Sequence, residues 1–577
     1  MLDYDVVIIG GGINGLTTAA YLGKAGLKTL VLEERGECGT HCDTVEPGIP
    51  GFLHNLQATE KVTGLSPCMS DLELERFGYE ITTTDYIWGN TFSDGKNALL
   101  GATMFDTIDN WTKLSPVDAE VYTKGLVEGV DDGGWDELLD FMHNFFYKAP
   151  KSSGLDDFAN LKVMRTLINA KGLDISPHEL VQMNGFQACD LIFDSEYIKT
   201  AVLSGSWVGG FSPVHRQIGV IGTLGFGLAA GAVFPVHNSK GGSHALPHAL
   251  IKCARNYGVD ILSCCPVEKI IIENGRAVGV KLTEHAVYPN QEIRAKKVVS
   301  NLTLIPTFKD LVGEEVIGTE MSSKINQFCY EENVVFCVNL ALKSAPQFKS
   351  AEFDDGIQRC FIGYYGGENS RKMAQFGSSL TSGRIFDDEL MANWLIPSLT
   401  DPGQAPEGCH TCILWLDAPP TITNYNGKRL NGFPAWDSMK LDLADKLVDE
   451  FEKYTIGFKD SIIEKFVVSP LDIYRNNQSA LKGNWMGGSL VPGQAFTDRP
   501  LPGIVRGGAS RTFIKDLYLS NSIHPHNMTW LASGYIAACE VAEDMGVREQ
   551  DWWTGKACRW YEENVDKIPI NLGVPDS

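Results

Sequence analysis

Apolar and polar positions follow a strand-helix-strand order at the start of the chain. Residues 6–9 form an unbroken apolar run, typical of a strand that is buried on both faces, and the run stops at Gly10. Residues 29–32 form a second apolar run, which ends at Glu33. Between the two runs, small and apolar residues recur at helical spacing, at Leu16, Ala19, Ala20 and Gly23. The pattern predicts a βαβ unit within residues 3–35.

The junction of the first strand and the helix carries the glycine pattern GxGxxG. Gly10 permits a tight turn, Gly12 lets the backbone approach a pyrophosphate, and Gly15 lets the helix pack closely on the strand. The positive end of the helix points at this loop and favours an anion. Glu33 follows at about the 20 residues at which an acid reaches a ribose 2′-hydroxyl, and its charge disfavours the 2′-phosphate of NADP. The motif predicts binding of the ADP half of FAD or NAD.

A second patterned block lies near the middle of the chain. Apolar residues at helical spacing over residues 244–256 predict a helix. Residues 267–272 and 277–282 flank an Asn-Gly turn and predict a hairpin, and residues 298–300 predict one more short strand.

Residues 218–236 are uncharged and form a stretch long enough for a transmembrane helix. The stretch is rich in glycine, and Arg216 and Lys240 on its two sides leave no charge asymmetry that would orient a membrane span. We therefore predict a buried segment that lines an apolar cavity and suits an apolar substrate. A surface in shallow, peripheral contact with a membrane is the alternative.

Length and charge narrow the class of protein. A chain of 577 residues exceeds one ordinary core and predicts two large domains. The formal net charge of −23 opposes general attraction to nucleic acid or to an anionic bilayer, so no nucleic-acid partner is predicted. The first strand starts within a few residues of Met1 without a signal sequence, which predicts a cytoplasmic location.

The cysteines show no disulfide framework, which suits a reduced compartment, although the chain has 14 of them. Cys38 and Cys42 are spaced CxxxC, whereas flavin disulfide reductases carry CxxxxC and a second dinucleotide fold, so ordinary thiols are favoured over a redox pair. A zinc site at Cys38, His41 and Cys42 would lack a fourth ligand. Cys409 and Cys412 precede an apolar strand and are interpreted as packed thiols. No metal site is predicted.

Several of these segments together resemble the phytoene-desaturase-like flavoproteins, the superfamily of the bacterial carotenoid desaturases. The resemblance rests on the N-terminal unit, on the sequence TVEPGIPGFLHNLQAT, on the middle block and on LYLSNSIHPHNMTWLASGYIAA near the C-terminus. It implies an α/β protein with a discontinuous, Rossmann-like FAD/NAD(P)-binding domain and an inserted α+β substrate domain. The hairpin and the C-terminal segment favour FAD over NAD.

The resemblance also implies how the chain divides. The FAD-binding domain is expected at residues 1–64, 235–305 and 492–550, and the substrate domain at residues 65–234 and 306–491. Residues 551–577 form a tail whose aromatic side chains are expected to pack on the body of the protein or on a second subunit of a homo-oligomer.

Cofactor contacts are carried over by position. The pyrophosphate would meet Gly10, Gly12, Ile13, Asn14 and Gly15. The adenosine would meet Glu33, with Glu34 and Arg35 beside it, and the backbone of Val267. Thr40, His41 and Asn301 complete the middle of the site, and Asn521, Ser522, Met528 and Thr529 approach the flavin ring. The C-terminal segment is expected to form a strand at residues 517–519 and a helix from about Thr529, whose N-terminus stabilises the reduced ring.

This chain departs from the family pattern in the C-terminal loop. Many relatives have glycines after His-Pro, whereas this chain has His526 and Asn527 after His524 and Pro525. His526 is the candidate general acid or base, with His524, Asn527 and His54 as further catalytic candidates. Tyr364, Tyr365 and Trp530 are candidate cavity aromatics. Together with Cys38-Gly39-Thr40-His41 in place of a Gly-Gly pair, these groups favour a substrate smaller or more functionalised than a long carotenoid.

The predicted function is that of an FAD-dependent oxidoreductase that removes or adds hydrogen across a C–C bond of an apolar or cyclic small molecule. Oxygen, a quinone, a nicotinamide or a redox protein would exchange electrons with the flavin. A flavin amine oxidase and a redox-neutral FAD-dependent isomerase or hydratase are the alternatives.

Overall fold

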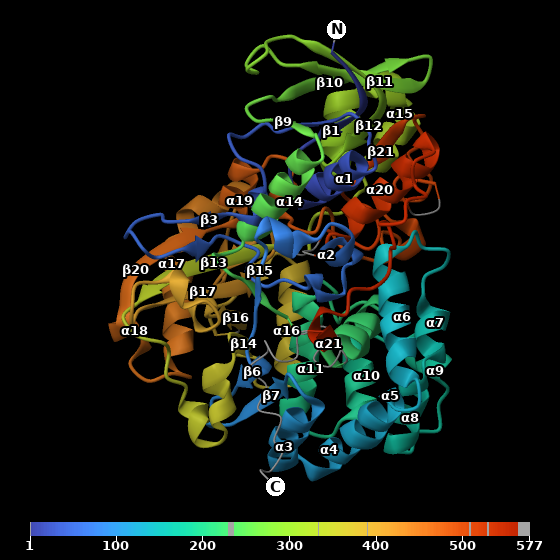
Figure 1. Cartoon of the computed structure of the whole chain (residues 1–577). Helices are drawn as coiled ribbons and strands as arrows, with labels where there is room; N and C mark the ends of the chain where they lie inside the picture. The colour runs from blue at the N-terminus through green and yellow to red at the C-terminus, as the bar shows by residue number, and fades with distance from the viewer. Residues whose placement is uncertain are drawn as a thin grey trace.

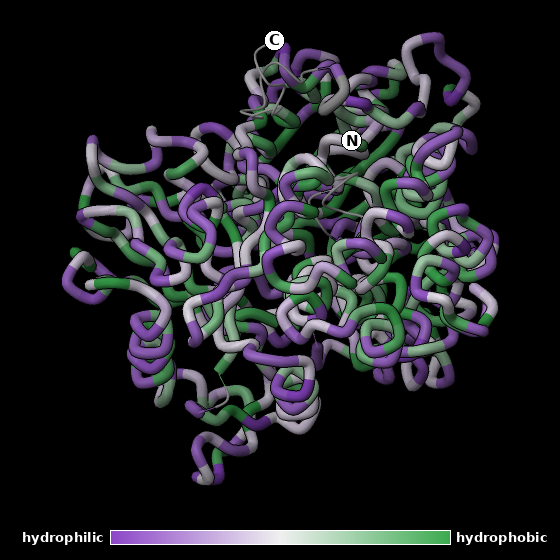
Figure 2. Tube along the Cα trace, turned by 90° about the horizontal axis from the view of Figure 1, so that it is seen from below, coloured by the Kyte–Doolittle hydropathy of each residue, from purple (hydrophilic) through white to green (hydrophobic). Residues whose placement is uncertain are grey.

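Two seven-stranded sheets and a group of helices organise the chain (Figure 1). The computed structural model describes residues 2–228, 236–332, 334–388, 390–506, 509–527 and 530–563. In the view of Figure 1, the first sheet lies at the top, the second at the left and the helical group at the lower right. Hydrophobic segments concentrate in the interior and hydrophilic segments lie mostly at the periphery (Figure 2).

The first sheet has the strand order β10-β11-β12-β1-β2-β9, and β21 also pairs with β12. β9, β2, β1, β12 and β21 run parallel, whereas β10 and β11 form an antiparallel hairpin. The strands span β1 Leu2–Ile9, β2 Thr29–Leu32, β9 Asp260–Leu262, β10 Val267–Glu273, β11 Arg276–Leu282, β12 Glu292–Ser300 and β21 Leu517–Leu519.

Strand β1 is buried on both faces, as its unbroken apolar run predicts. Val6 and Ile8 pack in one hydrophobic core, and Val7 and Ile9 pack in a second core on the other face. The helices that contribute to the first core include α1 (Ile13–Lys24), α14 (Ala245–Asn256) and α20 (Ala532–Met545). A polar side chain in this run would be buried whichever way it pointed.

Helix α20 packs on α1 through the backbone of Gly534, which contacts side chains of α1. The Gly534 N–H donates to Oδ1 of Asn14 at 3.0 Å, and the hydroxyl of Thr18 donates to the Gly534 carbonyl at 2.9 Å. A Cβ atom at Gly534 would lie 2.3 Å from the Asn14 carbonyl oxygen, so only glycine permits this approach. The two ends of the chain thereby form one helical layer on the first sheet.

The structure contains the elements predicted for the middle block and for the C-terminal segment, and it differs from the predictions at two boundaries. Helix α14, the hairpin and strand β21 lie where the pattern predicts them. Strand β12 begins at Glu292 rather than Val298, because its first half pairs with both β1 and β11. Helix α20 begins at Ala532 rather than near Thr529, because Leu531 adopts a left-handed conformation (φ 66°) immediately before it.

The second sheet combines strands from two distant parts of the chain. Its order is β20-β13-β17-β16-β14-β6-β7, and all neighbours are antiparallel except β14 and β6. The strands span β6 Tyr86–Thr91, β7 Asn97–Gly101, β13 Val335–Leu342, β14 Ile362–Tyr365, β16 Ala392–Leu395, β17 His410–Asp417 and β20 Ile462–Val468. The two predicted pieces of the substrate domain thus share one sheet.

Helix α17 (Trp436–Glu452) packs on the second sheet. The Trp436 ring stacks on Phe336 of β13 at 5.4 Å between centroids, and the Tyr365 hydroxyl donates to the Leu447 carbonyl. Residues 104–208 supply the helical group, whose longer members are α3 Met104–Leu114, α4 Pro116–Tyr122, α6 Gly134–Tyr147, α8 Lys162–Lys171, α10 Gly185–Ile192 and α11 Glu196–Val208.

The segment after β12 packs with the first sheet. Phe308, Ile325 and Phe328 share the hydrophobic core of Val7. Their sequence positions fall in the predicted substrate domain, which was expected to begin at residue 306. The packing favours a boundary near residue 330, and we propose the domain limits with that change.

The uncharged stretch at residues 218–236 is buried wherever the structure describes it. Residues 218–228 form helical turns inside the protein, and Leu224 and Leu228 face a small apolar space with Phe158. Residues 229–235 lie outside the described residues. Among the described helices, none combines the length and the apolar character needed to cross a bilayer.

The start of the aromatic tail packs on the body of the same chain. Trp552 and Trp553 contact the Tyr21 ring of α1, with centroids 5.9 and 4.7 Å away. The indole of Trp560 donates to Oε1 of Glu75 at 2.7 Å. The tail is described as far as residue 563, and to that point it covers the outer face of α1.

Candidate active site

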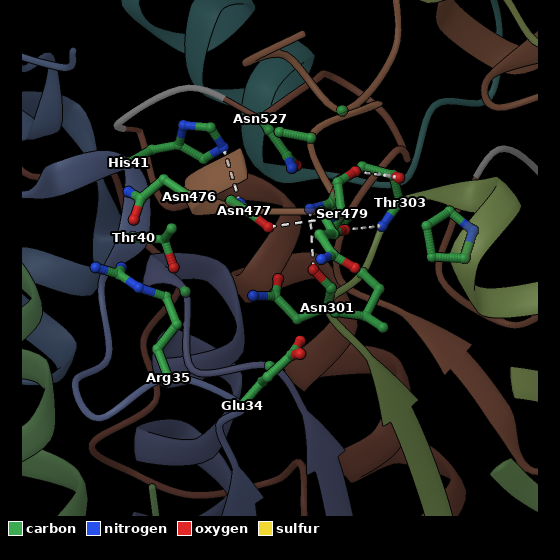
Figure 3. Close-up of a pocket in the computed structure, with 18 of the residues that line it drawn as sticks. Glu34, Arg35, Thr40, His41, Asn301, Thr303, Asn476, Asn477, Ser479 and Asn527 are labelled. Carbon is green, nitrogen blue, oxygen red and sulfur yellow. Dashed lines mark hydrogen bonds between the residues drawn. The ribbon is translucent and has the colours of Figure 1, made fainter. Parts of the chain in front are cut away.

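A cavity of about 580 Å³ begins at the carboxyl ends of β1, β2 and β12 and reaches the second sheet (Figure 3). This volume is typical of sites for small molecules and cofactors. One end is lined by Glu33, Glu34, Val267, Thr283 and Asp310. The other end is lined by Glu60, Val335, Trp415, Trp485 and Asn527.

The glycine loop forms a cradle that side chains would fill. Gly10 has a φ of +92°, a conformation that favours glycine. A Cβ atom at Gly12 would lie 2.8 Å from Nδ2 of Asn301, and one at Gly15 would lie 2.3 Å from the Gly10 carbonyl oxygen. The N-cap position of α1 is Gly12 itself, which offers no capping side chain to the helix N–H groups. The loop and helix end therefore fit an anionic pyrophosphate.

Glu33 organises the loop as well as facing the cavity. Its Oε2 accepts a hydrogen bond from the Gly11 N–H at 2.7 Å, and its Oε1 accepts one from the Arg35 N–H at 2.9 Å. The side chain is buried, and burial raises its pKa. Glu34 is exposed beside it at the cavity rim.

His41 joins two walls of the cavity. Its Nδ1 contacts Oε1 of Gln57, and its Nε2 accepts a hydrogen bond from Nδ2 of Asn477 at 3.2 Å (Figure 3). Burial lowers the pKa of His41 and favours the neutral ring that this pairing requires. Asn477 follows helix α19 (Pro470–Asn476), so the contact connects the adenosine side of the cavity with a segment far along the chain.

The C-terminal segment reaches the cavity beside β12. Nδ2 of Asn521 donates to the Asn301 carbonyl at 3.0 Å, and the hydroxyl of Ser520 donates to Oδ1 of Asn301 at 3.2 Å. Asn527 lines the cavity further along, and its buried Oδ1 has no hydrogen-bond partner among the described residues. An unpaired acceptor in a cavity wall fits a bound polar group.

A buried arginine shapes the wall that contains Gly487. Arg499 is fully buried and donates to the carbonyl oxygens of Met486 at 2.9 Å, Gly488 at 3.0 Å and Ile523 at 3.1 Å. Burial lowers its pKa to about 9. The guanidinium thereby ties the loop that lines the cavity to the C-terminal segment.

Most of the predicted cofactor residues lie together in this cavity. Its lining includes Gly10, Gly12, Ile13, Asn14, Glu33, Glu34, Arg35, Thr40, His41, Val267, Asn301 and Asn521. Gly15 packs behind the loop against Gly10, and the Ser522 hydroxyl donates to Oδ1 of Asn521 at 3.3 Å. Met528 and Thr529 lie outside the described residues. The cofactor roles themselves remain proposals.

The C-terminal histidines lie away from the described cavity lining. Nε2 of His524 contacts the Phe145 carbonyl at 2.6 Å, and Nε2 of His526 contacts the Gly209 carbonyl at 3.2 Å. Each ring is almost fully buried. Burial lowers the pKa of His524 to about 4 and that of His526 to about 3, so both are neutral at physiological pH.

The surroundings of these histidines are aromatic. The His526 ring stacks on Trp530 at 5.6 Å between centroids, and His524 meets the Phe145 ring edge-on at 5.3 Å. The acid-base role of His526 stays a prediction: its ring packs against Phe211 and Trp530, away from the described cavity lining. Of the four catalytic candidates, Asn527 alone is among the described cavity-lining residues.

His54 and the aromatic candidates also pack in the interior. His54 forms strand β4 (His54–Asn55), and burial lowers its pKa to about 4. Tyr364 and Tyr365 lie in β14, and Trp530 stacks on Phe146 at 4.2 Å between centroids. None of these four predicted residues is part of the described cavity lining.

The thiols near the cavity are free and mostly buried. Burial raises the pKa of Cys38 to about 12 and also raises that of Cys42, which opposes a reactive thiolate at either residue. Among the described residues, Glu37, His244 and His248 are the group whose potential ligand atoms lie within 4.8 Å of one another. Oε1 of Glu37 lies 3.2 Å from Nε2 of His244 and 3.1 Å from Nε2 of His248.

Several lining residues carry no signal that sequence reasoning used. They lie after β4, on β17, at the end of α19 and in the segment after α19, and they are Gln57, Glu60, Trp415, Asn476, Asn477, Ser479 and Trp485. The polar run at residues 476–479 is the one local sequence feature that could have indicated a binding site in this part of the chain. Glu60 follows the predicted segment 44–59 directly.

Comparison with known proteins agrees with this geometry. Residues 8–67 match the model of the NAD(P)-binding Rossmann-like domain family. A protein of Castellaniella defragrans that forms part of its limonene dehydrogenase is 27% identical over 563 residues, covering 95% of this chain and 96% of that protein. Phytoene desaturase of Fusarium fujikuroi is 22% identical over 603 residues, covering 98% and 94%.

The fold also matches a solved oxidase structure. A putrescine oxidase variant with redesigned cofactor binding superposes with a TM-score of 0.56 at 14% identity, covering 95% of this chain and 100% of that chain. Sequence relatives and fold agree with the resemblance derived from the motifs. Over nearly its whole length, the chain is similar to a limonene dehydrogenase protein and to a phytoene desaturase, which agrees with the resemblance to the phytoene-desaturase-like flavoproteins.

Proposed function

We propose that the cavity binds FAD and that the protein transfers hydride between this FAD and a C–C bond of an apolar or cyclic small molecule. The observation that carries the proposal is one continuous cavity between an uncapped helix N-terminus and the second sheet. The glycine cradle and Glu33 fit the ADP half at the first end. Asn521 and Asn527 lie toward the other end, which fits the flavin ring.

The residues of this chain have separable tasks in the proposed function. Gly10, Gly12 and the first turn of α1 bind the pyrophosphate, and Glu33 binds the ribose while it holds the loop. Val267 and Thr283 border the adenine. When bound, FAD supplies the two-electron redox chemistry. The packed walls of Val335 and Trp415 exclude water from the reacting end.

The substrate class is supported by the lining and by the relatives. Val335, Trp415 and Trp485 give the inner end an apolar and aromatic character, which suits a cyclic or apolar molecule. The relatives are named for their action on limonene and phytoene, both apolar hydrocarbons. Desaturation or saturation of a C–C bond is therefore favoured over oxidation of an amine.

Anaerobic flavin spectroscopy tests the proposed function. The purified protein is expected to retain FAD, identified after release by mass spectrometry, and to bleach with one class from a panel of cyclic ketones, enones, terpenes, polyenes and amines. A protein that contains no FAD and takes up none would contradict the proposal. Bleaching by amines alone would assign an amine oxidase, and turnover without any flavin redox change would assign an isomerase or hydratase.

A further inference from the structure

One carboxyl group belongs to the lining at the inner end of the cavity, and a second lies on a strand whose neighbour β13 lines it. Glu60 lines the cavity and is only 4% exposed. Asp417 ends strand β17 and stands directly opposite the cavity-lining Val335 of β13. The Tyr364 hydroxyl donates to Oδ2 of Asp417 at 3.2 Å. Asp and Glu side chains are almost never fully buried unless they are paired, and acidic groups with shifted pKa values cluster at functional sites.

The environment of these two carboxyl groups brings their pKa values close to neutral pH. Burial and the nearby charge of Asp417 raise the pKa of Glu60 to about 7, and burial raises the pKa of Asp417 to about 7. The Cys337 thiol, opposite Trp415 in the sheet, has a pKa raised by burial and by both carboxyls. Cys337 and Asp417 thus lie on neighbouring strands of the second sheet, and the charge of Asp417 contributes to the raised pKa of Glu60.

The neighbouring ammonium holds the turn that carries Glu60. Nζ of Lys61 donates to the carbonyl oxygens of Ala58 at 2.9 Å and Thr59 at 3.0 Å and to Oγ of Ser243 at 2.8 Å. These bonds use all three hydrogens of the ammonium. Lys61 thus fixes the backbone that precedes Glu60, and Glu60 is part of the cavity lining.

Two indole groups line the same end. Trp415 and Trp485 contact each other with ring centroids 5.9 Å apart. Nε1 of each is buried and has no hydrogen-bond acceptor within the described part of the chain. An indole N–H only donates, and a buried donor without an acceptor costs about 1–3 kcal/mol. A ligand oxygen would satisfy these donors.

We propose that Glu60 transfers the substrate proton and that the indole N–H groups of Trp415 and Trp485 bind an oxygen of the substrate, so that the substrate is a cyclic carbonyl compound dehydrogenated between its α and β carbons. This inference rests on the proposed function, because it places the substrate at the inner end of the FAD cavity. It names a substrate class and three residues that act on it.

The proposed reaction balances. The α C–H bond breaks and its proton passes to a carboxylate oxygen of Glu60, while the electron pair of that bond forms the α,β double bond. A hydride leaves the β carbon, and FAD, the two-electron oxidant of the proposed function, is reduced. The indole hydrogen bonds stabilise the negative charge that develops on the carbonyl oxygen. In the reverse direction Glu60 is the acid that protonates the α carbon.

The chemistry of the pocket favours a carbonyl compound over other substrates. A hydrocarbon has no atom that accepts from Trp415 or Trp485, so its binding would leave both donors unpaired. An ammonium group has no lone pair that could accept from the indoles, so its binding would also leave both donors unpaired. A ketone satisfies the donors and has α hydrogens acidic enough for a carboxylate with a pKa near neutrality.

Binding of two matched probes tests the indole groups without any turnover. The holoenzyme is titrated by calorimetry with cyclohex-2-enone and with cyclohexene, which lacks the oxygen. The enone is expected to bind about tenfold more tightly, and Trp415→Phe or Trp485→Phe is expected to remove most of that difference while leaving cyclohexene unaffected. Equal affinities for the two probes in the wild type would overturn the assignment of the indoles.

Hydrogen exchange tests Glu60 without hydride transfer. The anaerobically reduced holoenzyme is incubated with cyclohexanone in D₂O, and loss of α hydrogens is followed by NMR. Glu60→Gln is expected to slow the exchange about 100-fold, whereas exposed Glu407→Gln leaves it unchanged. Asp417→Asn is expected to shift the pH midpoint of the exchange about one unit lower, because a neighbouring negative charge is removed.

Outcomes for the inference and for the proposed function are distinguishable. Flavin content and circular dichroism of each variant report that it is folded and loaded. A folded, FAD-containing Glu60→Gln variant that exchanges α hydrogens at the wild-type rate would refute the role of Glu60 and leave the proposed function intact. Absence of FAD from the wild type would refute the proposed function itself.

Discussion

The backbone N–H of Gly11 donates a 2.7 Å hydrogen bond to Oε2 of Glu33, so the acid expected to bind a ribose also holds the glycine loop in place. We expect Glu33→Gln to weaken retention of FAD by about tenfold, because the amide loses the charge and presents one acceptor instead of two. Released flavin during dialysis provides the measurement. Glu34→Gln removes the same charge at an exposed neighbour, and a loss as large in that variant would contradict the organising role of Glu33.

The tight packing behind the loop predicts that alanine substitution at Gly15 and at Gly36 will change stability by very different amounts. In Gly15→Ala, the added methyl would lie 2.3 Å from the Gly10 carbonyl oxygen, so α1 must move away from β1. We expect a loss of about 1–3 kcal/mol in the free energy of unfolding and a protein without flavin. Gly36→Ala is the matched control, since no described atom lies within 4 Å of its Cβ position. Urea denaturation and the flavin absorbance of both variants measure the effect.

The buried histidines predict a loss of stability at acid pH. The pKa of His526 is lowered from 6.5 to about 3, so below pH 6.5 the unfolded chain binds a proton that the folded protein excludes. Stability from this residue is thus complete above pH 6.5 and falls by about 1.4 kcal/mol per pH unit as the pH drops toward 3.

The variant His526→Phe should remove that contribution. Its free energy of unfolding is measured in urea from about pH 7.5 to about pH 4.5, a range that spans the ordinary histidine pKa of about 6.5. As the pH falls, the free energy of unfolding is expected to decrease less steeply than that of the wild type. His285 is exposed, and His285→Gln should leave the slope unchanged. An unaltered slope in His526→Phe would mean that the ring takes up its proton in the folded state.

Because Arg499 is buried against the loop that lines the cavity, we predict that its replacement lowers both the free energy of unfolding and the flavin content. Arg499→Met leaves several backbone carbonyls without their donor, including those of Met486 and Gly488. We expect a loss of about 3–5 kcal/mol in the free energy of unfolding, together with reduced flavin content. The exposed Arg429→Met should lie within about 0.5 kcal/mol of the wild type. Thermal denaturation with and without added FAD distinguishes a global loss from a local one.

Local sequence patterns were sufficient to predict the main elements of the nucleotide-binding half of the fold. The apolar run at residues 6–9 and the Asn-Gly turn between β10 and β11 report on neighbours a few residues away, and both elements form as predicted. Strand β12 was predicted too short because its first half depends on β1 and β11, which no local pattern records.

The reacting end of the site depends on distant contacts. Glu60, Trp415 and Trp485 come from three parts of the chain, and each by itself resembles an ordinary core or surface residue. His526 stands in a conspicuous motif, yet its ring packs against Trp530 and against Phe211, which is distant in the chain. A motif thus identifies the segment that reaches a site more readily than the side chain that acts there.

The docking of α20 on α1 has a consequence for biosynthesis. Asn14 and Gly534 are 520 residues apart, so a ribosome completes the glycine loop long before it makes the helix that covers it. During most of translation, the apolar outer face of α1 and the open edge of β12 have no native partner, which is a state that favours aggregation. We therefore expect the nascent chain to need protection by chaperones and to acquire its flavin only after the C-terminal segment has left the ribosome.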